Sequence, residues 1–101
     1  MSVNEFVQLV KTVAERSSNE LLKTIAVMSA DKCAEAFTEL DRAQTPSQLL
    51  TAFEDFVYYC RDAYHSASAS THGETARKLA DVYRSLLLEA ESRVLSFFAK
   101  K

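Results

Sequence analysis

Apolar residues recur along this chain at the three- and four-residue intervals that are typical of α-helices. Within residues 46–70 the spacing alternates between four and three, through Leu49, Phe53, Phe56, Cys60, Ala63 and Ala67. A similar stripe follows within residues 73–99, through Ala76, Ala80, Tyr83, Leu87, Ala90, Val94 and Phe97. No stretch sustains the apolar/polar alternation of a strand. The pattern predicts an all-α protein with coiled-coil-like packing.

Capping patterns predict where these helices begin. Thr45-Pro46-Ser47-Gln48 offers a capping hydroxyl, a proline at the first helical position and a glutamine three residues after the cap. Similar patterns begin at Ser2 and at Thr71. We therefore expect helices over residues 3–42, 46–70 and 73–99, the last two antiparallel because the connection between them is short.

The first predicted helix is too long for a matched bundle. Forty residues make a rod of roughly 60 Å, against about 36 to 40 Å for the other two. The helix could break near Ser17-Ser18-Asn19-Glu20, itself a capping pattern, or continue and project beyond its neighbours. We expect the second, a three-helix antiparallel bundle in one domain, because serine is tolerated inside long helices.

A projecting first helix would have to bury its apolar residues against another chain. The residues concerned are Val3, Phe6, Val7 and Val10. This arrangement predicts a homo-oligomer. The stripe of the same segment continues through Ala14, Leu21, Ile25, Met28 and Leu40.

A second set of apolar residues lies off the predicted stripes. Leu86, Leu87 and Leu88 are consecutive and span about 200° of the helix, so they cannot all face one partner. Either the last helix touches both of the others, or an exposed patch awaits a partner. For the patch we expect an interaction face of Val57, Tyr64, Leu88, Leu95 and Phe98.

Composition narrows the function classes. The chain of 101 residues is 48% apolar and 26% charged with a formal charge of −2, and acids and bases are interleaved. The sequence lacks the basic stripe that would indicate nucleic-acid binding. Its apolar runs are also far shorter than the roughly 20 residues of a membrane span. A secretory signal needs basic residues at its start and an uninterrupted apolar core. This sequence has an acid near its start, and Lys11 interrupts the apolar run, so we expect a cytoplasmic protein. Cys33 and Cys60 occupy apolar positions, which favours buried thiols.

No catalytic or metal-binding pattern stands out in the sequence. His65 and His72 have no acid or cysteine that completes a metal set, and Gly73 is too isolated for a phosphate loop. We therefore expect no cofactor and no enzymatic activity. A small helical enzyme stays as a distant alternative, with Arg77, Lys78 and Arg84 as the groups that would hold a ligand.

The segment 36–69 resembles the phasins, small all-helical proteins that coat bacterial polyhydroxyalkanoate granules. In that family a helix ends in a leucine and a small residue, and a threonine-proline and a glutamine or glutamate begin the next, aromatic-bearing helix. The matching residues here are Leu40, Ala43, Thr45, Pro46, Gln48, Leu49 and Phe53. The chain departs from the family at Tyr58-Tyr59-Cys60, where small residues are usual, and in lacking an alanine- and lysine-rich tail.

This resemblance implies a non-enzymatic, self-associating cytoplasmic protein that lays an apolar helix face on a hydrophobic granule or on protein partners. The alternative is a small homodimeric adaptor or inhibitor of bacterial or phage origin that binds another protein.

Overall fold

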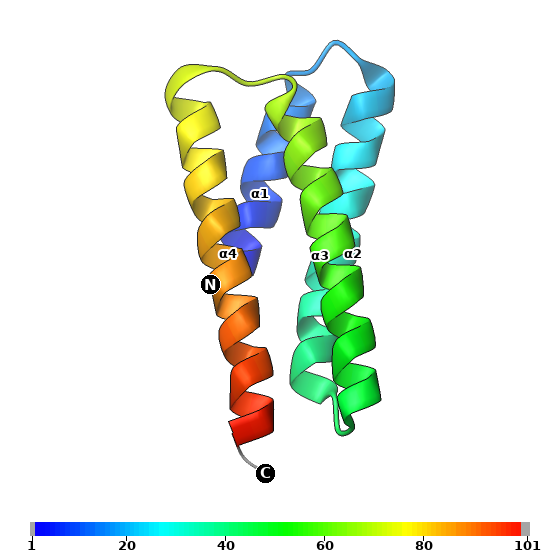
Figure 1. The fold of residues 1–101 in the computed structure, drawn as a ribbon. Coiled ribbons are helices and arrows are strands. Elements are labelled where there is room, and N and C mark those ends of the chain that lie inside the picture. Colours follow the sequence, from blue (N-terminus) through cyan, green and yellow to red (C-terminus); the bar gives the residue numbers. More distant parts are fainter. Residues whose placement is uncertain (1, 100–101) are drawn as a thin grey trace.

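Four helices form the part of the chain that the structure, a computed structural model, describes, namely residues 2–99 (Figure 1). They are α1 (Ser2–Glu15), α2 (Glu20–Arg42), α3 (Pro46–Ser68) and α4 (Gly73–Ala99). The helices run alternately up and down in an elongated bundle of 48 × 24 × 16 Å. The all-α prediction is confirmed, and the predicted number of helices is wrong.

The predicted continuous first helix is broken between α1 and α2. Asn19 has the extended backbone of an N-cap, and its side-chain oxygen accepts hydrogen bonds from the amides of Leu21 and Leu22 at 3.0 and 3.1 Å. The Asn19 amide donates to the Ser17 hydroxyl at 3.2 Å. These side chains satisfy the amides that a helix would otherwise pair internally, so they stabilise a turn at the capping pattern.

This turn folds α1 back into the bundle. Val3, Phe6, Val7 and Val10 are buried within the chain itself, and the Phe6 ring lies 6.1 Å from the Tyr83 ring of α4. The expectation that these four residues project toward another chain depended on a continuous rod and is corrected here. They belong to the core of the subunit.

The connection between α2 and α3 agrees with the sequence prediction. α2 ends at Arg42, Pro46 opens α3, and Thr45 and Gln48 form the reciprocal capping box. The Thr45 hydroxyl accepts from the Gln48 amide at 3.2 Å, and the Gln48 side-chain oxygen accepts from the Thr45 amide at 3.3 Å. The single proline therefore begins a helix, as predicted.

Among the described residues, the most extensive contact between two helices is that of α2 with α3. At one end the rings of Phe37 and Phe56 meet with their centroids 5.6 Å apart. Toward the other end the facing residues are small and fully buried or nearly so: Ala26, Ala30, Ala63 and Ala67. The predicted α3 stripe is buried except for Phe53, which is half-buried.

The core face of α4 is rotated from the prediction. Its buried residues are Leu79, Val82, Leu86 and Ala90. Of the predicted stripe only Ala90 is fully buried, and the other residues lie half-buried at its edge. The difference arises because α4 packs against α1 as well as α3, and a three-helix expectation had no α1 in that position.

One end of the bundle holds two turns that touch. The Ser70 hydroxyl, between α3 and α4, donates to the Ser17 hydroxyl, between α1 and α2, at 3.1 Å. Gly73 in the second turn has φ of +63°, the left-handed region that favours glycine. α1 begins near the middle of the bundle, so the C-terminal half of α4 runs past it (Figure 1).

Candidate interaction surface

Large apolar side chains are exposed along the outer side of α4. Leu88 and Leu95 have 61% and 71% of their surface exposed, and Phe98 has 46%. Leu88 and Leu95 are seven residues apart, so they share one side of the helix. We call these three residues the α4 stripe. Their exposure agrees with the part of the predicted interaction face that lies on α4.

The two α3 residues of the predicted face are less open. Tyr64 is half-buried, and its ring stacks on that of Tyr83 with the centroids 4.3 Å apart and the planes 7° apart. Tyr64 is therefore part of the packing between α3 and α4. Val57 is also half-buried and packs against the core.

An ionic and aromatic contact fixes the orientation of the α4 stripe. The Arg93 guanidinium pairs with Asp41 of α2 and with Glu89 one turn earlier on α4, the latter at 3.2 Å. It also lies over the Phe37 ring, 4.4 Å from its centroid. Hydrogen bonding to the Asp41 carboxylate raises the pKa of Arg93. Because this cluster holds one side of α4 on α2, the opposite side faces outward.

Four further exposed apolar residues lie outside the predicted interaction face. Leu21 and Met28 on α2 are 69% and 61% exposed, although the predicted stripe of the first segment placed them in the core. Leu50 and Tyr58 on α3 are also exposed. The alternative stripe Ala26, Ala30, Cys33, Phe37 and Leu40 was visible in the sequence. Its alanines are less apolar than leucine and methionine, so a ranking by hydrophobicity alone favours the stripe that is exposed.

A shallow hollow of about 320 Å³ lies on the outer side of α3. It is lined by Phe53, Glu54, Val57, Tyr58 and Arg61. Glu54 and Arg61 are seven residues apart, and neither forms an ion pair within residues 2–99. The Arg61 guanidinium lies 5.9 Å from the centre of the Tyr58 ring. An acid and a base thus flank an aromatic and an aliphatic side chain on one helix face.

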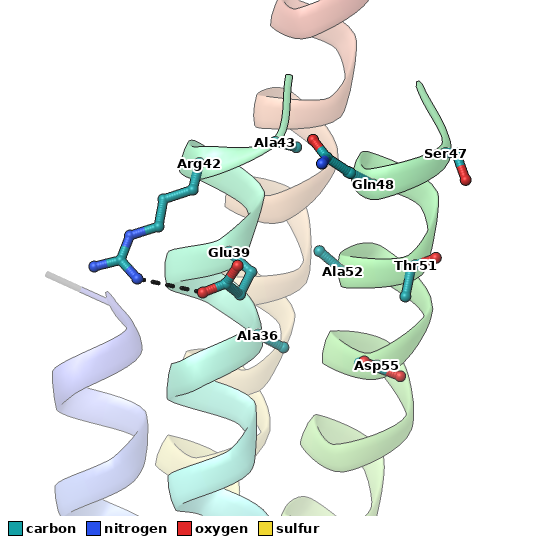
Figure 2. A pocket seen from close by; sticks show the side chains of 9 residues that line it. All are labelled: Ala36, Glu39, Arg42, Ala43, Ser47, Gln48, Thr51, Ala52 and Asp55. Atoms are coloured by element: carbon teal, nitrogen blue, oxygen red, sulfur yellow. Dashed lines mark hydrogen bonds and ion pairs between the residues drawn. The ribbon is translucent and has the colours of Figure 1, made fainter. Parts of the chain in front are cut away.

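A hollow of about 440 Å³ lies beside the turn between α2 and α3 (Figure 2). Ala36, Ala43 and Ala52 give it apolar surface, and the remaining lining residues are Glu39, Arg42, Ser47, Gln48, Thr51 and Asp55. Figure 2 shows Arg42 paired with Glu39, at 3.3 Å. The Gln48 side chain is taken up by the capping box. The charged group left over is the carboxylate of Asp55, and a single carboxylate does not make an acid/base pair.

Among residues 2–99, no three histidine, cysteine or acidic side chains are grouped so that they could hold a metal ion. Over the same residues, no helix has both the length and the hydropathy needed to cross a membrane.

Comparison of the chain with known protein families, with characterised proteins and with solved structures found no match.

Proposed function

We propose that this chain is a non-enzymatic interaction protein of the cytoplasm that coats hydrophobic storage granules in the manner of a phasin, with the α4 stripe as its adsorbing surface. The observation that supports the proposal is the exposure of Leu88, Leu95 and Phe98 on a helix whose other side is fixed in the core. A polymer surface needs no pocket, only an apolar face that reaches it. The resemblance of segment 36–69 to the phasins points in the same direction.

The size of the stripe is consistent with reversible adsorption. Burial of apolar surface contributes about 25 cal/mol per Å². A few hundred Å² of buried stripe would therefore supply several kcal/mol, of which part is offset by the entropy lost on binding. Binding of this strength depends on each of the three side chains.

The proposal is tested by co-sedimentation with particles of poly(3-hydroxybutyrate). Lysine at Leu88 or Phe98 places a charge in the adsorbing face, so Leu88→Lys and Phe98→Lys should each reduce the bound fraction at least about tenfold. Circular dichroism should show the same helix content as the unchanged protein, since both positions are exposed.

Ser96→Lys is the matched control. Ser96 is exposed on the same helix and gains the same charge. It points about 100° away from Leu95 and about 160° away from Phe98 around the helix axis, so its charge stays off the stripe. The control should bind as the unchanged protein does. Equal binding by Leu88→Lys, Phe98→Lys and Ser96→Lys would remove the α4 stripe from the mechanism.

A homodimeric adaptor is the second candidate, favoured by the hollow on α3. In an antiparallel pairing of two α3 helices centred between Val57 and Tyr58, Glu54 of each copy would face Arg61 of the other. The same pairing would cover Val57 and Tyr58. Two such ion pairs and the covered rings are the kind of self-complementary patch that a two-fold interface requires.

A further inference from the structure

The two cysteines of the chain lie opposite each other in the core. Cys33 is one helical turn before Phe37 on α2, and Cys60 is one turn after Phe56 on α3. α2 and α3 are antiparallel, and the rings of Phe37 and Phe56 are in contact. One turn back along α2 and one turn forward along α3 therefore reach the same level of the core, so Cys33 and Cys60 lie in one layer. Both thiols are fully buried in that layer. A further layer on, Ala30 and Ala63 occupy the corresponding positions.

The neighbouring alanines bring the two helices close together. Packed helices have axes about 8 to 10 Å apart, and each Cα lies about 2.3 Å from its axis. Cα atoms that face each other directly are then roughly 3.4 to 5.4 Å apart, which overlaps the range of about 4.4–6.8 Å found in disulfides. Direct contact between the thiols is also indicated, because a hydrogen bond with Cys33, followed by burial, raises the pKa of Cys60.

We propose that Cys33 and Cys60 form a latent disulfide site that links α2 to α3 when the protein meets a disulfide oxidant of low molecular weight. The bond would link the two helices that have the most extensive contact in the described part of the bundle. It would leave the α4 stripe untouched, so this inference does not depend on the proposed function.

The reaction is a double thiol–disulfide exchange. The thiolate of one cysteine attacks a sulfur of an oxidant such as glutathione disulfide, and one glutathione leaves as its thiolate. The thiolate of the second cysteine then attacks the protein sulfur of this mixed disulfide and expels the second glutathione. The two cysteines lose two protons and two electrons, and one glutathione disulfide becomes two thiols.

Burial controls the rate of this exchange. The fully buried thiols are out of reach of glutathione, and the raised pKa of Cys60 keeps it protonated at neutral pH. Oxidation therefore requires α2 and α3 to separate transiently, after which closure of the pair brings the sulfurs back together. The site would respond to prolonged oxidising conditions.

The test compares the disulfide equilibrium in folded and unfolded chains. The protein is refolded in buffers with graded ratios of reduced to oxidised glutathione, quenched with acid and analysed by intact mass, and the series is repeated in denaturant. The intramolecular disulfide is recognised as a species about 2 Da lighter than the reduced protein. If the fold holds the sulfurs together, the equilibrium constant for forming this disulfide should be about 100-fold larger in native buffer than in denaturant. The oxidised protein should unfold about 10 °C higher than the reduced protein.

An equal or smaller constant in native buffer would overturn the proposal, because it would mean that the fold opposes the bond. Glutathione adducts or cross-linked chains as the main products at every ratio would overturn it as well. Cys60→Ala supplies the control, since its single thiol at Cys33 should accept glutathione in denaturant and remain free in native buffer. Equal modification of this variant in both conditions would contradict the enclosed geometry.

Discussion

At the scale of single residues, Tyr83 joins three of the four helices. Its ring stacks on Tyr64 of α3 and lies 6.1 Å from Phe6 of α1. Burial is the largest cause of a raised pKa at Tyr83, Cys60 adds to the rise, and Arg61 partly offsets it. The phenol is therefore held in its neutral form by the fold.

Tyr83 should make the protein less stable at alkaline pH. Since its pKa is higher in the folded chain than the ordinary value of 10.0, its contribution is fully present below pH 10 and is lost as the pH rises through the folded pKa. Tyr83→Phe should abolish this part of the pH dependence and leave the ring stacking in place. Urea unfolding at several pH values from 8 to 11 measures both proteins. Parallel loss of unfolding free energy in the two would show that Tyr83 does not titrate in this way.

At the scale of helices, the segment from Ser17 to Asn19 decides the topology. Asn19→Ala alone removes the N-cap and should lower the free energy of unfolding by about 1 kcal/mol. Alanine at Ser17, Ser18 and Asn19 together favours a continuous helix. That helix would withdraw α1 from its own bundle, and its apolar side would then be buried in a second copy, as in domain swapping.

The triple alanine variant should therefore have twice the mass of the unchanged protein in solution, as measured by light scattering. Alanine at Ser85 and Ser92, which are exposed and already lie within α4, is the control and should leave the mass unchanged. An unchanged mass of the triple variant would show that packing of α1, and not the capping side chains, sets the turn.

Helix boundaries followed from local chemistry wherever one signal dominated. The Thr45 capping box and the proline beside it satisfy backbone groups locally, so they were predicted correctly and found in place. At Ser17 to Asn19 a capping pattern competes with a continuous helix, and the prediction of a continuous helix is wrong. Capping and helix propensity differ there by only about 1 kcal/mol, so burial of α1 decides the outcome. That burial depends on contacts with α2 and α4 that no local pattern contains.

The prediction of which apolar residues are exposed was also only partly correct, because burial depends on contacts between helices. Leu88, Leu95 and Phe98 were predicted to be off the core and are exposed, whereas Leu21 and Met28 were placed in it and are exposed too. Hydrophobicity alone does not predict which of two apolar stripes of a helix is buried when the neighbouring helix packs against the stripe with the smaller side chains. Here the alanines of α2 permit close approach to α3, and larger residues in their place would hold the helices apart.

At the scale of the whole molecule, the charges on α3 predict how two copies would meet. Glu54→Arg places like charges together in the antiparallel pairing, so it should weaken self-association at least about tenfold. Glu54→Arg combined with Arg61→Glu restores opposite charges and should restore the association. Sedimentation velocity over a concentration series measures both variants. Equal self-association of all three proteins, or the failure of the double exchange to restore it, would exclude this interface.

The short α1 also decides where an attached label would lie. Its first described residues sit at the waist of the rod and not at a tip (Figure 1). A tag or fluorophore fused ahead of them would emerge sideways, beside the middle of α4 (Figure 1). A reporter meant to extend from an end of the bundle belongs instead in the loop between α3 and α4, which lies at one end (Figure 1).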